Sequence, residues 1–284
     1  MTNPRVTGAT PGIVAITLVA GTGMAAVVAT SVGLMPLYGE PTPSLGGWRA
    51  AAPDLLGGIG ESLLIALPAT VVAALVGFLV AMVMLAGGWT GAAVRAVCLT
   101  VLAVPHVVGA TSVNLLLGDG GLAARLATRT GNDTWPALVG GPWPVATVLE
   151  LAWKESAFVA LVVLAAVAPG HRSRMQVAAG LGARPVQRVL GVLVPTALPA
   201  LGAASLVTLV YAIGSYEVAW LLGRATPEPL PVLAFRLFGS IELTDRPAAA
   251  AAAVTGSALA LLVAVPALAA LPRLRFLSVA GGTP

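Results

Sequence analysis

Four charged side chains, Glu150, Lys154, Glu155 and Glu217, fall within long runs of apolar residues. An unpaired charge in hydrocarbon costs about 3 kcal/mol or more, so we expect each of them to face protein or water. In a helix, Glu150 and Lys154 share one face and are able to pair, because they are four residues apart. Two interpretations stay open. Either Lys154, Glu150, Glu217 and the neighbouring Tyr216 form a translocation path or its gate, or the charges tie helices together.

The sequence offers no arrangement typical of an enzyme. A Walker phosphate-binding loop needs Gly-Lys followed by Ser or Thr, but the only lysine, Lys154, follows Trp153 within an apolar run. Neither a Gly-x-Ser-x-Gly elbow nor a His-Glu-x-x-His pair is present. Cys98, His106 and His171 have no carboxylates at metal-ligand spacing. We therefore predict no catalytic residues, no metal and no cofactor in this chain.

The composition is that of an integral membrane protein. Of the 284 residues, 58% are hydrophobic and only 9% are charged, whereas a soluble globular domain has about a quarter of its residues charged. Disordered chains are excluded because they are poor in apolar residues. The net charge of +4 does not indicate nucleic-acid binding, because the basic residues form short clusters between apolar runs.

The apolar runs predict an all-α, polytopic fold. About 20 apolar residues suffice for a spanning helix, and the runs lack the alternation of a membrane barrel. The first run is longer than the core of a signal peptide, so we expect it to be retained. The sequence predicts six transmembrane helices, at about residues 12–36, 60–86, 93–117, 144–168, 198–223 and 247–271.

The arginines predict the orientation of the transmembrane domain, residues 12–271. Six spans place both termini on one side of the membrane. The connecting segments of that side hold eight arginines and no acidic residue, whereas those of the other side hold six arginines and eight acidic residues. By the positive-inside rule, the acid-free side is cytoplasmic. We therefore expect residues 1–11 and the tail, residues 272–284, to be cytoplasmic.

Residues 170–197, between the fourth and fifth spans, have helical signals of their own. A Ser-x-x-Gln capping box that ends at Gln176 predicts the start of a short helix, and Gly182 suits its left-handed end. Pro185 fits the first turn of a second, amphipathic helix, which Pro195 should end. These signals predict a rigid helical protrusion on the cytoplasmic surface.

The stretch from Gln176 to Pro195, QVAAGLGARPVQRVLGVLVP, resembles the EAA loop of inner-membrane permeases of binding-protein-dependent ABC importers. That pattern is Glu-Ala-Ala, three residues, Gly, nine residues, then Ile-x-Leu-Pro. Its spacing is fully kept: Ala178, Gly182 and Pro195 are identical, while Gln176 stands where the family has Glu. The substitution removes the charge that an ion pair with the ATPase would need there.

The resemblance covers about residues 55–270, because Trp153 to Phe158 is similar to the start of the family's fourth common span and Ser215 to Gly223 to the outer end of its fifth. It implies the fold of a type I importer, with a coupling helix between helices four and five. This helix docks on a cytoplasmic ATPase and passes its motion to the spans. The resemblance assigns ATPase coupling to Gln176, Ala178, Ala179, Gly182, Ala183 and Arg184.

The resemblance also implies a location and partners. The chain would be a permease subunit in the bacterial plasma (inner) membrane, forming half of a translocation pathway in membrane lipid. Its partners would be an ABC ATPase dimer that binds ATP and Mg, a second permease subunit, identical or homologous, and an extracytoplasmic solute-binding protein. The runs around Gly182 and from Glu217 resemble the polyamine, iron, thiamine and sulfate branch. The alternative is a secondary transporter or channel driven by an ion gradient, which would need no docking segment.

Overall fold

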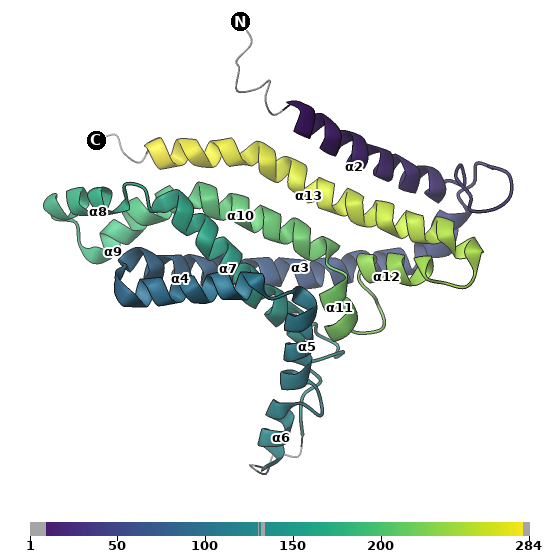
Figure 1. The fold of residues 1–284 in the computed structure, drawn as a ribbon, viewed down its shortest axis with the longest axis horizontal. Coiled ribbons are helices and arrows are strands. Elements are labelled where there is room, and N and C mark those ends of the chain that lie inside the picture. Colours follow the sequence, from purple (N-terminus) through teal and green to yellow (C-terminus); the bar gives the residue numbers. More distant parts are fainter. Residues whose placement is uncertain (1–9, 130, 132–133, 281–284) are drawn as a thin grey trace, which may run out of the picture. The chain divides into compact units, whose positions relative to one another are not determined.

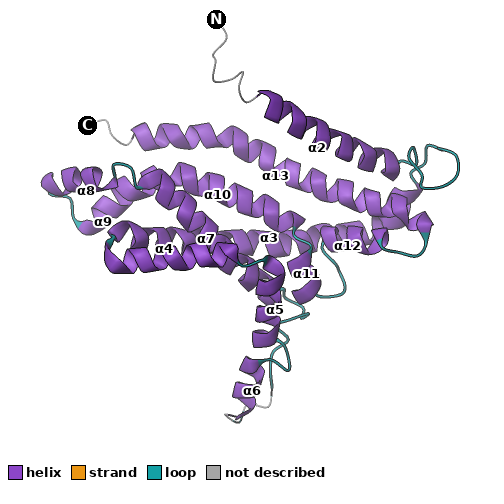
Figure 2. Ribbon diagram, in the orientation of Figure 1, coloured by secondary structure: helices purple, strands orange, loops and turns teal. Residues whose placement is uncertain are grey.

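The computed structural model describes residues 10–129, 131 and 134–280, and these residues form helices joined by turns and loops, without a strand (Figures 1 and 2). Among them, five helices are long and apolar enough to cross a membrane, or six if one bent pair counts as a single span. The all-α membrane fold is therefore confirmed. The main helices are α2 (Thr10–Ser31), α3 (Gly46–Ala86), α4 (Gly88–Ala103), α5 (His106–Leu117), α6 (Leu122–Arg129), α7 (Val145–Val167), α8 (His171–Gly180), α9 (Pro185–Arg188), α10 (Val194–Gly214), α11 (Glu217–Leu222), α12 (Leu230–Phe238) and α13 (Arg246–Ala280).

The described residues fall into two compact units, one of residues 10–60 with 228–258 and one of residues 61–227 with 259–280. In the first unit, small residues allow α3 and α13 to approach closely. A side chain at Gly47 would lie 2.6 Å from the Cβ of Pro247. Ala51 and Ala248 are buried nearby, and Trp48 donates from its indole nitrogen to the hydroxyl of Ser31 at 3.3 Å, which ties α2 to α3.

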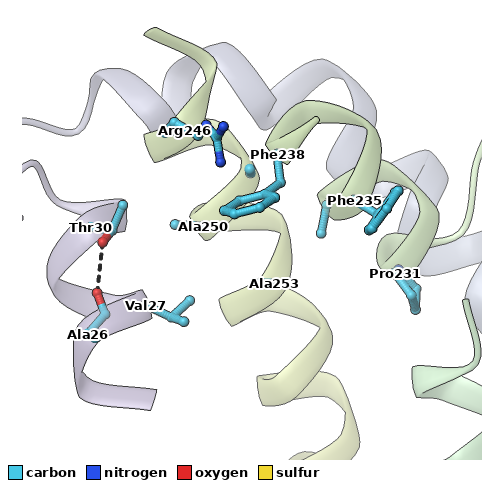
Figure 3. Close-up of a pocket in the computed structure, with 11 residues that line it drawn as sticks. Ala26, Val27, Thr30, Pro231, Phe235, Phe238, Arg246, Ala250 and Ala253 are labelled. Atoms are coloured by element: carbon cyan, nitrogen blue, oxygen red, sulfur yellow. Dashed lines mark hydrogen bonds between the residues drawn. The ribbon is translucent and has the colours of Figure 1, made fainter. Parts of the chain in front are cut away.

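An apolar pocket of about 420 Å³ lies between α2, α12 and α13 of this unit (Figure 3). Phe235 and Phe238 of α12 and Val27 of α2 contribute to its wall. The guanidinium of Arg246 stacks 4.0 Å from the centre of the Phe238 ring, a cation–π contact that lets the charged group border an apolar space.

Helix α7 is the centre of the second unit, where it packs against α4, α5, α10 and α11. Val159 and Val163 are fully buried in its core. A side chain at Gly77 would meet the Cβ of Val159 at 2.7 Å, so glycine permits the close crossing of α3 and α7. In a bilayer there is no hydrophobic driving force between helices, so close van der Waals packing at such small residues holds the helices together instead.

The helix bounds differ most from the predicted spans at three places. Helix α3 begins at Gly46, well before residue 60. The run 93–117 is broken between α4 and α5, because Pro105 has no N–H and forces the preceding Val104 into an extended conformation. The run 198–223 is broken after Gly214, where α10 ends before the short helix α11 begins.

Candidate functional site

A cluster of charged residues lies inside the second unit, where α5, α7 and α10 meet. Glu150 and Lys154 of α7 are only 1% and 3% exposed. His106, the first residue of α5, places its Nδ1 3.2 Å from Oε1 of Glu150 and its Nε2 3.6 Å from Oε1 of Glu155. The imidazole thus bridges two carboxylates that point different ways from α7.

The spacing of Lys154 and Glu150 had suggested that the two side chains pair, but they do not. The ammonium group of Lys154 instead donates to the backbone carbonyl of Val104, the residue directly after α4. The break at Pro105 frees that carbonyl from helical hydrogen bonding, and the lysine supplies the donor that it lacks. Glu150 turns to His106 instead.

Helix α10 completes the cluster. The hydroxyl of Thr208 donates to Oε2 of Glu155 at 3.2 Å, and the ring of Tyr211 lies 5.0 Å from that of His106. Space beside the cluster is limited, because a Cβ at position 109 would lie 2.5 Å from Oε1 of Glu150, so Gly109 makes room for the carboxylate. The arrangement ties three helices together at the point where one of them is broken.

Glu217 and Tyr216, also predicted for the path or gate, lie at the start of α11, next to the second helix break. Glu217 is exposed, and the ring of Tyr216 stacks on Trp220 with centroids 6.2 Å apart. Within the described part of the chain, no hydrogen bond or ion pair joins Glu217 to the cluster around His106. The four predicted residues therefore occupy two places, with Glu150 and Lys154 in the buried cluster and the other two outside it.

Sequence reasoning missed His106 and a second buried ion pair. From the sequence, His106 was rejected as a metal ligand and given no other role, although a polar residue directly after a helix-breaking proline was a usable signal. The second pair joins Glu61, 1% exposed, to Arg224, whose Nη1 also donates to the carbonyl of Pro142 at 3.1 Å. Both lie near predicted span ends, where they had been counted as loop charges.

The coupling segment, residues 170–197, begins with a tightly fastened helix. Helix α8 starts at His171 after Gly170 in a left-handed conformation, so the predicted capping box at Gln176 is wrong: glycine turns the chain three residues earlier than a serine cap would. The guanidinium of Arg174 donates to the carbonyls of Val167 and Pro169, both at 3.1 Å. These bonds fasten α8 to the end of α7.

The turn and second helix of the segment largely follow the sequence signals. Gly182 is left-handed, with φ at +81°, and α9 begins at Pro185, with the backbone N–H of Arg184 donating to Oε1 of Gln187 at 2.8 Å. Pro195, however, does not end this helix. A π turn over Val189–Leu193 leads directly into α10, and this wider turn separates the proline ring from the preceding carbonyls.

Large apolar side chains are exposed along the coupling segment. Val177, Leu181, Val186 and Leu190 are 62–84% exposed. Of the six residues that the sequence assigns to ATPase coupling, Gln176, Ala179, Gly182 and Arg184 are exposed, and Ala178 and Ala183 are partly buried. Large apolar side chains left exposed together on a short connecting segment are typical of a site that a partner protein covers.

Comparison with known proteins supports the resemblance found in the sequence. No protein-family model matches the chain. It is 32% identical, over 204 residues, to the inner membrane ABC transporter permease protein YnjC of Escherichia coli (strain K12). That alignment covers 69% of this chain and 38% of YnjC, so the chain spans less than half the length of this relative.

Two solved structures share the fold. One is a bacterial alginate ABC transporter in complex with an alginate pentasaccharide-bound periplasmic protein, with a TM-score of 0.73 and 17% identity over 95% of this chain and 94% of the other. The second is a bacterial ABC transporter involved in alginate import, with a TM-score of 0.70 and 18% identity over 95% of each chain. The chain is thus a multi-pass membrane protein similar to an inner membrane ABC transporter permease in sequence and to ABC importers in fold.

Proposed function

Starting from this similarity to ABC transporter permeases, we propose that the chain is a permease subunit of an ABC importer. It forms half of a translocation pathway and couples ATP hydrolysis by a separate ATPase to solute uptake. The observation that carries this proposal is the coupling segment, which is fastened at one end by Arg174 and continuous with α10 at the other, and whose apolar side chains are exposed.

The mechanism is the transfer of a rigid-body motion. An amphipathic helix in the groove of a partner transmits a displacement only if its own ends are fixed to the elements that must move. Here α8 would transmit the displacement of the ATPase to α7, and α9 would transmit it to α10. The residues assigned to the ATPase contact are Gln176, Ala178, Ala179, Gly182, Ala183 and Arg184. Because Gln176 carries no charge, it would contribute hydrogen bonds to this contact and no ion pair.

The partners and orientation follow the same proposal. The assembly would contain an ATPase dimer that binds ATP and Mg, a second permease, identical or homologous, and an extracytoplasmic solute-binding protein. The acid-free, arginine-rich segments support a cytoplasmic position for the coupling segment, for residues 1–11 and for residues 272–284. The basic residues are scattered between spans, which supports membrane lipid and no nucleic acid as the surroundings.

The intramembrane residues divide between two roles in this proposal. Glu150 and Lys154 act as interhelical ties in the wall of the pathway, which their burial and their contacts with His106 and Val104 support. Glu217 and Tyr216 line the path or its outer gate, which the exposure of Glu217 beside a helix break supports.

Co-purification of the ATPase tests the proposal. Gly182→Pro is incompatible with a φ of +81°, because proline fixes φ near −65°. We expect the ATPase to co-purify with wild type and to be lost from Gly182→Pro. Gly191→Ala is the matched control within the same segment, since its new Cβ meets nothing within 4 Å. Solute uptake driven by an ion gradient without any ATPase would instead favour the secondary transporter.

A further inference from the structure

A cavity of about 400 Å³ opens at the end of the second unit that carries the coupling segment. It is bordered by the end of α3, by α4, by the end of α7 and by the start of α8, elements that Figure 1 shows grouped together. Gly87 and Gly88, with φ of +78° and +70°, reverse the chain between α3 and α4 at this point. A smaller cavity of about 190 Å³ adjoins it and shares Gly87 and Arg95 in its wall.

The wall of the larger cavity is positively charged. The charge comes from Arg95 of α4 and Arg172 of α8, and the imidazole of His171 lines the same space. Within the described ranges, neither Arg95 nor Arg172 has a hydrogen bond or an ion pair, in contrast to Arg174, which is engaged with two carbonyls. The first turn of α8 borders the same space, and its N-terminus has no side-chain cap.

None of the residues that line the cavity is acidic. Residues 62–118 and 156–216, which include every residue lining the cavity, contain no Asp or Glu. Two guanidinium groups with free donors and an uncapped helix N-terminus together favour an anion with several acceptor oxygens. Arginine matches phosphate in particular, because its planar fork can bind two oxygens at once.

The cavity lies beside a residue typical of the membrane surface. Trp89, in the first turn of α4, is 86% exposed and follows Gly87 by two residues. Tryptophan is enriched where bilayer and water meet, which is also the level of lipid phosphates. The volume exceeds that of a lone phosphate ion and leaves room for a substituent on it.

We propose that this cavity binds a phosphate group between Arg95 and Arg172, carried by an anionic lipid headgroup or by free phosphate, and that this anion links the start of the coupling segment to the α3–α4 turn. The inference concerns a site other than the ATPase contact, and it holds whether or not an ATPase binds. Burial and the charge of Arg174 lower the pKa of His171; a bound phosphate would oppose that effect.

The test uses the full chain in phosphatidylcholine nanodiscs, in two arms. In the first, phosphatidylglycerol is added, and native mass spectrometry counts the lipid retained. In the second, inorganic phosphate is added against equal ionic strength of chloride, and the thermal unfolding midpoint is followed. We expect one of the two arms to show binding to the wild-type chain. Arg95→Gln and Arg172→Gln should each weaken this binding about tenfold, because each removes a charge-assisted hydrogen bond. The responding arm identifies the source.

Controls separate a site from general surface charge. Arg129→Gln removes the same charge from an exposed position at the end of α6 and should bind as wild type does. If the glutamine variants misfold, Arg95→Lys and Arg172→Lys keep the charge and lose the fork, and we expect weaker binding from both. The proposal is overturned if neither arm shows binding, or if Arg129→Gln loses as much as the cavity variants.

Discussion

Two regions of the molecule differ in whether their side chains find partners within the chain. One is the buried cluster around His106, and the other is the coupling segment, residues 170–197. Glu150 and Lys154 are 1% and 3% exposed and each has a partner within the chain, whereas Val177 and Leu181 are 64% and 84% exposed. Buried charges are tolerated only when they are paired. Exposed aliphatic side chains avoid unfavourable contact with water only when a partner protein covers them or when they face lipid. The cluster is therefore complete within this chain, whereas under our proposal a partner protein covers the coupling segment.

This contrast predicts that stability and assembly can be changed separately. Substitutions in the cluster should lower the free energy of unfolding, because they leave buried groups without partners. Substitutions of the exposed apolar side chains in the coupling segment, such as Val177 and Leu181, should leave that free energy almost unchanged and should weaken the association with the ATPase.

The largest effect on stability is expected from His106→Ala. The change leaves two carboxylates without the imidazole that bridges them, and removing one partner of a buried pair costs about 3 kcal/mol. A double-mutant cycle with Glu150→Ala, measured by chemical unfolding in mixed micelles, should give a coupling of about 1 to 3 kcal/mol. Additive effects of the two substitutions would contradict the proposed tie.

Two glycine substitutions should sharpen the contrast further. Gly109→Ala places a methyl group 2.5 Å from a carboxylate oxygen of Glu150, and such overpacking costs about 1 to 3 kcal/mol. Gly182→Ala meets nothing within 4 Å, so its cost is only the left-handed strain of about 1 to 2 kcal/mol. Unfolding measurements on both variants check the difference. A larger loss for Gly182→Ala than for Gly109→Ala would reverse the comparison.

Arg174→Gln should have a smaller effect, because the residue is exposed. It loses two hydrogen bonds to the carbonyls of Val167 and Pro169, and we expect about 1 kcal/mol of destabilisation in thermal or chemical unfolding. Arg129→Gln, in the last turn of α6, is the control for the lost charge. Equal stability of the two variants would show that Arg174 does not fasten α8.

The smallest effect is a dependence on pH at His171. Burial and the nearby Arg174 lower the pKa of His171, so the folded chain takes up its proton less readily than the unfolded chain. Stability should therefore be fully present above a pH of about 6.5, the ordinary histidine pKa, and should decline as the pH falls below it. Comparing unfolding midpoints of wild type and His171→Gln across this range measures the effect. The variant should lack that part of the decline.

The sequence predicted the fold class well because hydrophobic length is a local property. It located Glu150 and Lys154 for the same reason, since a charge in an apolar run is visible at once. Their partners were not predictable in this way: Val104 and His106 lie more than 40 residues away, and only the break at Pro105 turns them toward α7. The sequence predicted one continuous span at residues 93–117, whereas the helix in fact ends and restarts at Pro105.

The coupling segment shows where local signals succeed and fail. Gly182 and Pro185 were placed correctly, because a left-handed turn and a first helical turn each favour one residue type strongly. The start of α8 was wrong, since Gly170 and a serine cap compete for the same role within three residues. Pro195 was wrong because a π turn, which no simple sequence pattern predicts, carries the helix past it.

The most direct test of the central claim is ATPase co-purification with the double variant Val177→Ser, Leu181→Ser. Leu262→Ser, at a 73% exposed position on α13 and outside the segment in sequence, serves as the control. We predict that the double variant loses the ATPase while its unfolding midpoint stays at the wild-type value, and that the control keeps the ATPase. Retention of the ATPase by the double variant would contradict the claim that this surface is where the partner docks.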